Sequence, residues 1–455
     1  MEMILEFLRD VLSQPALLIG IMSCVGLIAL KRPFHKIMTG TLKPILGYLM
    51  LAAGAGVIVS NLDPLGKMIE HGFHITGVVP NNEAIVAVAQ KVLGVETMSI
   101  LVVGLLMNLF IARFTKFKYV FLTGHHSLFM ACLMSAVLGT AGLSGIELIL
   151  VGGFLMGAWS AISPAIGQSY TSKVTDGDEI ALGHFGSLGY YLSAWVAKYV
   201  GKVEESTEDI EIPEKWGFLR DSTLSTALTM IVFYLIAAIA AGSEFVATLS
   251  GSMSPYLFAV MSAMNFAVGV AIVYSGVRMI LGDLIPAFQG IATKIIPNAI
   301  PAVDCAVFFT YAPTAVVLGF ISSFIGGIIG MLILGAVGGV LIIPGLVPHF
   351  FCGATAGIYG NATGGRRGAA VGAFLNGLAI TFLPALALPV LGQLGFQNTT
   401  FGDADFAVMG LVLGNAFEWI GMAGIYGVVV IAALVLIIPN FIKTKGKVIN
   451  YVEEE

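Results

Sequence analysis

The sequence predicts an all-α polytopic membrane protein with about 11 transmembrane helices in two inverted repeats, plus re-entrant half-helices. Three observations lead to this prediction: an apolar composition, a repeated order of motifs and an uneven distribution of basic residues. Hydrophobic residues make up 57% of the 455 residues and charged residues only 11%, whereas soluble domains have roughly 25% charged residues. This composition excludes a soluble domain, and nothing in it indicates a nucleic-acid partner.

Motifs of the first half return in the second half in the same order. Phe7-Leu8-Arg9-Asp10 returns as Phe218-Leu219-Arg220-Asp221, the acid Glu83 is matched by Asp304, and His125 is matched by His349. The offsets are 211 (9 to 220), 221 (83 to 304) and 224 (125 to 349), a slow drift that an old duplication with small insertions would leave. We divide the chain into a first repeat (1–168), a connecting segment (169–211), a second repeat (212–392) and a final span with its tail (393–455).

Each repeat is expected to contain five spans, because several apolar runs approach the roughly 20 residues that a spanning helix needs. The first repeat has predicted spans at 15–30, 43–62, 95–112, 119–140 and 146–167. The second repeat has them at 222–242, 256–281, 322–343, 344–363 and 368–392, and a last span follows at 419–440. Five is an odd number, so the second repeat should enter the membrane upside down relative to the first.

The basic residues support this count. With the N-terminus outside, 19 of the 22 Lys and Arg residues fall on the inner side, and only Arg9, Lys67 and Lys91 remain outside. An excess of Lys and Arg in cytoplasmic loops is the usual bias of membrane proteins. We therefore expect an external N-terminus, a cytoplasmic C-terminus and a bilayer around the spans between them.

Three stretches do not fit simple spans. Residues 83–93 and 304–320 follow the two matched acids, and we interpret them as half-helices or arms of re-entrant hairpins. Residues 180–200 are apolar and glycine-rich, and acidic residues flank them on both sides. This third stretch is expected either to dip into the bilayer or to pack beneath the site.

Glu83 and Asp304 are the first candidate site residues. Each stands at the start of an apolar segment, where a carboxylate can simply cap a helix by accepting backbone N–H bonds. Their matching positions in the two repeats favour a functional interpretation instead, since paired breaks of this kind form polar sites at the membrane midplane. Asn82 stands beside Glu83 and is included in the site.

The histidines form the second group of candidates. His125 and His184 are predicted to contact a ligand, because an imidazole at membrane depth usually faces a cavity or a partner. Adjacent residues of a helix point about 100° apart, so His126 is expected to pack in the interior, as is His349. The chain has neither an HExxH nor a CxxC motif, and we predict no metal and no cofactor.

Carboxylates, imidazoles and an amide suit a small polyhydroxylated ligand, because together they accept from hydroxyl groups and donate to them. The same groups suit a cation or a proton relay almost equally well. The alternative is therefore an ion-coupled secondary transporter in which Glu83 and Asp304 bind H⁺ or Na⁺. An intramembrane enzyme is a weaker third alternative, since no nucleophile–base pair or catalytic residue is evident.

A series of motifs also resembles a known family. They are Thr41-Leu42-Lys43 with Ala53-Gly54-Ala55-Gly56, Phe121-Leu122-Thr123-Gly124-His125, Ala181-Leu182-Gly183-His184, Ala302-Val303-Asp304-Cys305-Ala306, and Tyr311-Ala312-Pro313. Over essentially its whole length the chain resembles the ascorbate-type permease component, enzyme IIC, of the bacterial sugar phosphotransferase system. The resemblance implies a homodimer in the bacterial plasma membrane, with a dimerising scaffold and a core that moves the sugar by an elevator-like shift. It also implies cytoplasmic partners: enzyme IIB, whose phosphocysteine phosphorylates the sugar, and enzyme IIA.

The resemblance implies site residues as well. His125, His184 and Asp304 match positions that bind ascorbate in the family. Asn82 and Glu83 fall where the family has a threonine–tyrosine pair, and Phe129 and Phe185 fall where it has glutamine. We expect all seven to line one cavity. Loss of two amide side chains changes the hydrogen bonds available to a ligand, so the transport mechanism transfers to this chain more securely than the substrate does.

Overall fold

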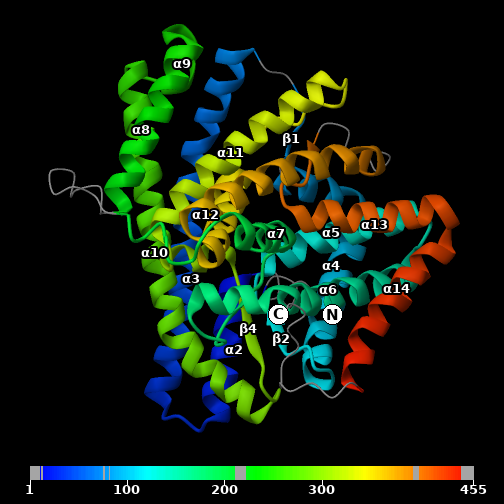
Figure 1. The fold of residues 1–455 in the computed structure, drawn as a ribbon. Coiled ribbons are helices and arrows are strands. Elements are labelled where there is room, and N and C mark those ends of the chain that lie inside the picture. The colour runs from blue at the N-terminus through cyan, green and yellow to red at the C-terminus, as the bar shows by residue number, and fades with distance from the viewer. Residues whose placement is uncertain are drawn as a thin grey trace.

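The computed structural model describes residues 11, 14–74, 77–80, 82–210, 222–392 and 399–441. These residues are mostly helical (Figure 1). The helices are α2 (Pro15–Ala29), α3 (Phe34–Phe73), α4 (Asn82–Phe114), α5 (Gly124–Thr140), α6 (Gly145–Thr175), α7 (Ser187–Val200), α8 (Ser222–Ala241), α9 (Ser243–Ser250), α10 (Pro255–Lys294), α11 (Pro313–Ala336), α12 (Leu346–Gly392), α13 (Ala404–Ile420) and α14 (Met422–Ile437). Two 3₁₀ turns are η2 (Cys305–Thr310) and η3 (Ile438–Asn440). The strands are β1 (Val79–Pro80), β2 (Tyr119–Phe121), β3 (Ala181–Leu182), β4 (Ile300–Val303) and β5 (Thr399–Thr400).

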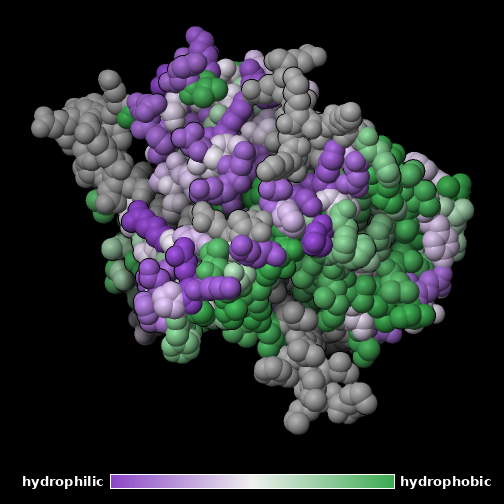
Figure 2. All heavy atoms as spheres, turned by 90° about the horizontal axis from the view of Figure 1, so that it is seen from below, coloured by the Kyte–Doolittle hydropathy of each residue, from purple (hydrophilic) through white to green (hydrophobic). Residues whose placement is uncertain are grey.

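The helices are those of a multi-pass membrane protein. Seven helices of the described part are long and apolar enough to cross a membrane, and α8 with α9 makes an eighth if that bent pair is one span. Large apolar side chains such as Ile239, Leu332 and Ile431 are more than 60% exposed, as expected of surfaces that face lipid. Figure 2 shows such an apolar area beside a hydrophilic one on the same face.

The predicted number of about 11 spans is larger than this count. Helices α2 and α5 have only 15 and 17 residues, and α12 is counted once although its backbone leaves the helical conformation at Gly364 and Gly365. A Cβ atom on Gly360 would lie 2.5 Å from the carbonyl oxygen of Gly368, whereas residues eight apart in a straight helix are about 12 Å apart. The chain therefore reverses at this break, which falls between the predicted spans 344–363 and 368–392.

The two predicted half-helices are wrong. Residues 83–93 are part of the continuous helix α4. Residues 304–320 form η2 and the first turns of α11, which begins at Pro313 because a proline in the first turn loses no helical hydrogen bond. The candidate for a re-entrant element is instead the pair α8 and α9, whose axes bend by 117°.

The all-α prediction also missed five short strands. Strands β2, β4 and β3 form a parallel sheet in that order, and β1 pairs with β5 in parallel. Both β1 and β4 contain a proline, Pro80 and Pro301, and proline favours extended backbone at itself and at the residue before it. Backbone groups buried in a membrane protein must find partners inside the protein, so these extended segments pair with one another.

Helices α3 and α10 pack closely along glycines. A Cβ atom on Gly54 would lie 2.7 Å from the carbonyl oxygen of Gly269, and one on Gly47 would lie 2.8 Å from that of Gly276. Small residues at such a crossing let two backbones approach within a membrane. Together with α8, these helices form the upright bundle at the left of Figure 1, and Gly54 therefore serves packing. The stretch 180–200 forms β3 and α7. Its first half is buried, whereas Trp195 and Tyr199 are 51% and 73% exposed, and both predicted alternatives for this stretch stay predictions.

Candidate functional site

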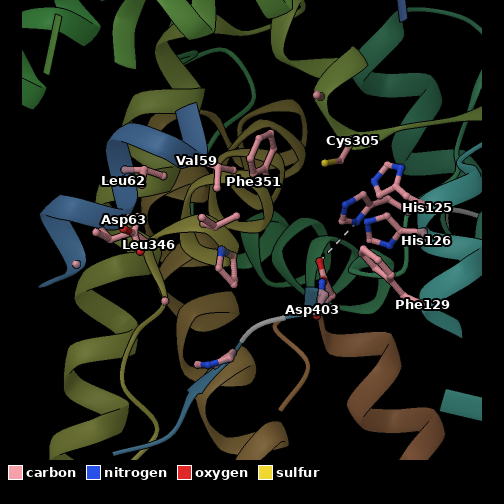
Figure 3. A pocket seen from close by; sticks show the side chains of 18 of the residues that line it. Val59, Leu62, Asp63, His125, His126, Phe129, Cys305, Leu346, Phe351 and Asp403 are labelled. Carbon is pink, nitrogen blue, oxygen red and sulfur yellow. Dashed lines mark hydrogen bonds and ion pairs between the residues drawn. The ribbon is translucent and has the colours of Figure 1, made fainter. Parts of the chain in front are cut away.

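A cavity of about 700 Å³ lies between α3 and the segments that carry the histidines and acids. In Figure 3, Leu62 and Asp63 of α3 stand on one side, while His125, His126 and Phe129 of α5 stand on the other. Asp63, Lys67 and Glu70, near the end of α3, also line it. A ligand of sugar size fits a cavity of this volume.

The short strands place the polar side chains of the cavity. Asp304 directly follows β4, His184 comes two residues after β3, and His125 comes four residues after β2. Because these three strands are parallel neighbours, their carboxyl ends meet at one edge of the sheet, where ligands of parallel sheets commonly bind. Asp403 follows β5 in the same way, and Asn82 follows β1.

Asp304 both caps a helix and lines the cavity, the two roles that the sequence left open. Its Oδ1 accepts a hydrogen bond from the backbone N–H of Ala306 at 3.0 Å, which caps η2. Its Oδ2 lies 3.4 Å from His125 Nε2. His125 Nδ1 lies 3.2 Å from the hydroxyl of Tyr48 on α3. A chain of polar contacts thus connects the strand edge with α3 across the cavity.

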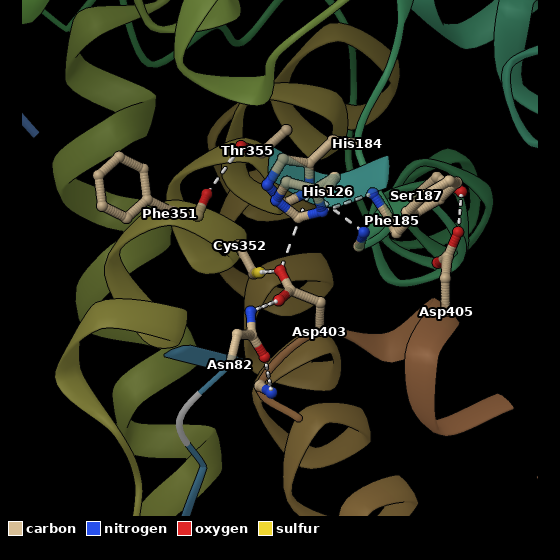
Figure 4. Close-up of polar contacts among 12 residues, drawn as sticks. Asn82, His126, His184, Phe185, Ser187, Phe351, Cys352, Thr355, Asp403 and Asp405 are labelled. Carbon is tan, nitrogen blue, oxygen red and sulfur yellow. Dashed lines mark hydrogen bonds and ion pairs between the residues drawn. The ribbon is translucent and has the colours of Figure 1, made fainter. Parts of the chain in front are cut away.

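Asp403 is the second acid of the cavity, and it is only 5% exposed. Its Oδ2 accepts from Asn82 Nδ2 at 2.6 Å, and its Oδ1 accepts from the Cys352 thiol at 2.9 Å (Figure 4). The Asn82 side-chain oxygen in turn accepts from the backbone N–H of Gly402 at 2.9 Å. Asn82 is therefore fixed between the segments that follow β1 and β5.

Two imidazoles lie against each other deep in the cavity. The ring centroids of His126 and His184 are 3.8 Å apart, and their planes are tilted by 46°. The Nδ1 of His184 accepts from the backbone N–H of Gly186 at 3.1 Å and lies 2.9 Å from the Tyr190 hydroxyl. The Nδ1 of His126 accepts from the backbone N–H of Phe185 at 3.3 Å. A nitrogen that accepts carries no proton, so the backbone holds both rings in the neutral form with hydrogen on Nε2.

Five of the seven predicted site residues line the cavity together: Asn82, His125, Phe129, His184 and Asp304. The side chain of Glu83 lies outside the described part of the structure. Phe185 was wrongly predicted to line the cavity. Its ring is fully buried and stacks on Phe121 at a centroid distance of 4.6 Å, because the chain after β3 turns this side chain away from the cavity.

The lining residues that the prediction missed include Tyr48, His126, Cys305 and Asp403. His126 was expected to pack in the interior, but both His125 and His126 line the cavity. His349 does lie outside the cavity and contacts the Ser323 hydroxyl at 2.9 Å. The sequence pattern at Asp403, an acid followed by an apolar run, is the one that also marks Asp304.

Two groups of side chains bring ligand types for a metal ion close together. His126, His184 and Asp403 form one, and His184, Asp304 and Cys305 form the other, with ligand atoms within 4.8 Å of one another. Imidazole, thiolate and carboxylate are the ligands of zinc and related ions. The absence of a metal stays a prediction, and the tautomers described above leave only Nε2 of each ring available.

A comparison with known families decides what kind of membrane protein has this cavity. The family of the sugar-specific permease component of the phosphotransferase system, EIIC-GAT, matches residues 10–405. The chain belongs to this permease family. The predicted resemblance is thereby confirmed.

A curated relative is similar over most of the chain. The "Ascorbate-specific PTS system EIIC component" of Mycoplasma pneumoniae is 26% identical over 417 residues, and the match covers 78% of the present chain. This chain spans only 62% of the relative's length. The relative's substrate and partners are therefore only proposals for this chain.

Proposed function

We propose that this permease binds L-ascorbate or a related small sugar and moves it inward, where the phosphocysteine of an enzyme IIB phosphorylates it. Enzyme IIA recharges enzyme IIB, so the residues that transfer the phosphoryl group lie on these partners. The observation that carries the proposal is the cavity itself, with Asp304, His125 and His184 at one edge of the sheet. Buried acceptors and donors of this kind bind hydroxyl groups and reject ligands that lack them.

An elevator-like movement is part of the proposal. Helices α2, α3, α8, α9 and α10 contact mainly one another, and their fewer contacts with the remaining elements are to η2, β4, α12, α11 and α5. The cavity lies at this boundary, with Tyr48 and Leu62 on α3 and the acids on the other side. A sliding core would carry the polar residues past α3, which is the arrangement that alternating access between two bundles needs. We propose that the first group is the scaffold, and that it dimerises.

The pairing of the strands supports an inverted duplication with about five spans in each half. Helices α3 and α10 both have 40 residues, and their starts and ends are each 221 residues apart (34 to 255 and 73 to 294). Val120 of the first half pairs with Pro301 of the second half. The residues one repeat away from these two, Ile342 and Val78, also form a bridge with each other. The third strands, β3 and β5, then flank β4 and β1 respectively. We propose on these grounds that repeats 1–168 and 212–392 share one fold.

The cavity also suggests which side is open. Its mouth is lined by Lys67 and Asp63, which are 52% and 60% exposed and form an ion pair at 2.8 Å. These residues lie near the end of α3, whereas the basic Lys31, Arg32 and Lys36 lie around its start. A positive-inside orientation places the start in the cytoplasm. We propose that the structure has its cavity open to the outside, in line with an external N-terminus and a cytoplasmic C-terminus.

Labelling with a membrane-impermeant maleimide tests this orientation. In intact cells we expect Lys67→Cys to react, and Lys36→Cys to react only after the membrane is permeabilised. Cys132, Cys305 and Cys352 are buried and Cys24 is half-buried, so the unchanged protein is labelled in parallel to measure the background of the native cysteines. Equal labelling of Lys36→Cys in intact cells would contradict the proposed orientation.

Uptake of labelled sugar tests the mechanism. Right-side-out membrane vesicles that contain the permease, and enclose enzymes IIA and IIB with the phosphocarrier proteins that recharge IIA from phosphoenolpyruvate, should accumulate phosphorylated sugar only when phosphoenolpyruvate is enclosed as well. The alternative, an ion-coupled transporter using Glu83 and Asp304, would accumulate unmodified sugar and stop when the H⁺ and Na⁺ gradients are collapsed. Accumulation of unmodified sugar without phosphoenolpyruvate would thus replace the proposed mechanism with the alternative one.

A further inference from the structure

The charge of the cavity indicates which class of sugar it selects. Two carboxylates, Asp304 and Asp403, enter it from the ends of two different strands and are 7% and 5% exposed. A ring nitrogen of His184 lies within 4.8 Å of a carboxylate oxygen of each acid. A ligand that reaches His184 is therefore close to both acids at once.

Both acids accept hydrogen bonds from neighbouring groups of the protein. Asp403 uses both oxygens as acceptors, one toward Asn82 and one toward Cys352. Asp304 accepts from the backbone N–H of Ala306. Hydrogen bonds donated to a carboxylate stabilise its charge. A carboxylate also has about four acceptor sites, so oxygen lone pairs remain for a ligand.

Positive charge in the cavity does not balance these acids. His126 and His184 are neutral, because the Nδ1 of each ring accepts a backbone N–H. The Nε2 of His125 lies 3.4 Å from Asp304 Oδ2. Among the described residues that line the cavity, Lys67 is the one lysine or arginine, and it pairs with Asp63 at the exposed mouth. Two carboxylates therefore stand at the buried end, where the described lining residues include no lysine or arginine.

We infer that the cavity selects an uncharged polyhydroxylated sugar over an anionic one, and that Asp403 is a residue that sets this preference. The inference rests on the proposed function and narrows its substrate class to the uncharged sugars related to ascorbate, so that ascorbate itself is the weaker ligand. Hydroxyl groups of a neutral sugar donate to the two carboxylates and accept from the imidazole Nε2–H groups. An anion offers no proton at its charged oxygen and is repelled by a net negative site in a medium of low dielectric constant.

Two matched ligands test the inference on the purified full-length permease. L-Gulono-1,4-lactone keeps the six-carbon lactone framework of L-ascorbate but is uncharged at pH 7, where ascorbate is an anion. Dissociation constants are measured for both by calorimetry at pH 7. We expect the lactone to bind at least about tenfold more tightly, a difference of about 1.4 kcal/mol.

The variant Asp403→Asn is expected to reduce this preference about tenfold, because it removes one of the two buried charges while keeping the shape of the side chain. Glu204→Gln is the matched control: it removes a charge from an exposed residue outside the cavity and should leave the preference unchanged. A residue that only supports the fold would weaken both ligands equally, so a changed ratio indicates direct discrimination.

Three results would overturn the inference. The first is ascorbate binding as tightly as the lactone in the unchanged protein, which leaves the permease function intact. The second is an unchanged preference in folded Asp403→Asn, which removes the assigned role of this residue. The third is an absence of binding by either ligand and by neutral pentitols and hexitols, which would refute the proposed sugar site together with the inference. Because the first comparison uses the unchanged protein, it stands even if Asp403→Asn does not fold.

Discussion

Replacing Asp304 by Asn is expected to weaken sugar binding by one to two orders of magnitude. The carboxylate is 7% exposed, caps η2 and lies 3.4 Å from His125 Nε2. Asn keeps the size of the side chain but loses the charge, and a hydrogen bond to a charged group contributes about 1.5–3 kcal/mol. About 1.4 kcal/mol corresponds to a tenfold change in affinity. Dissociation constants of the purified protein for its tightest ligand provide the measurement.

His349→Ala is the control for this variant. His349 is also a buried histidine, and it occupies the position in the second half that matches His125, but it lies outside the cavity beside Ser323. We expect folded His349→Ala to bind sugar with nearly unchanged affinity, even if its thermal stability is lower. Equal losses of affinity at both positions would mean that Asp304 supports the fold and does not bind the ligand.

Asp405→Ala is expected to have the largest effect on stability. This carboxylate is fully buried and connects three helices. It accepts from Trp159 Nε1 of α6 at 3.1 Å, from the Ser187 hydroxyl of α7 at 2.7 Å and from the backbone N–H of Leu188 at 2.9 Å. Alanine leaves all three donors without this acceptor, and each loss from a charged group contributes about 1.5–3 kcal/mol. A total of about 3 kcal/mol or more is a large fraction of the stability of a folded protein.

Thermal melting of the detergent-solubilised protein, followed by size-exclusion chromatography after heating, measures this loss. Asp405→Asn keeps one oxygen acceptor and should fall between the unchanged protein and Asp405→Ala. The matched control is Glu204→Ala, since Glu204 is exposed and surface changes usually alter stability by less than about 0.5 kcal/mol. A melting temperature of Asp405→Ala equal to that of the control would show that the three contacts do not stabilise the fold.

The sequence predicted those site residues whose polar side chains are costly to bury within a membrane. Asp304, His125 and His184 are polar side chains within apolar runs, so burial alone marked them. His126 and Asp403 were missed for two different reasons. The angle between adjacent residues of a helix predicted that His126 would pack in the interior, whereas the structure places it in the lining of the cavity. Asp403 lies 99 residues from Asp304 (304 to 403), and only the pairing of β5 with β1 places it beside Asn82.

The sequence by itself determined the class of this protein, since composition, apolar runs and the motifs around the histidines are local properties of the chain. Its membership of the permease family followed from the same motifs. Only the tertiary structure decided that the acids stand at strand ends and that Phe185 turns away from the cavity. It also decided that two imidazoles are neutral. The physical reason is that extended, proline-containing segments inside the protein must pair their backbone groups with distant segments, and no local pattern specifies those partners.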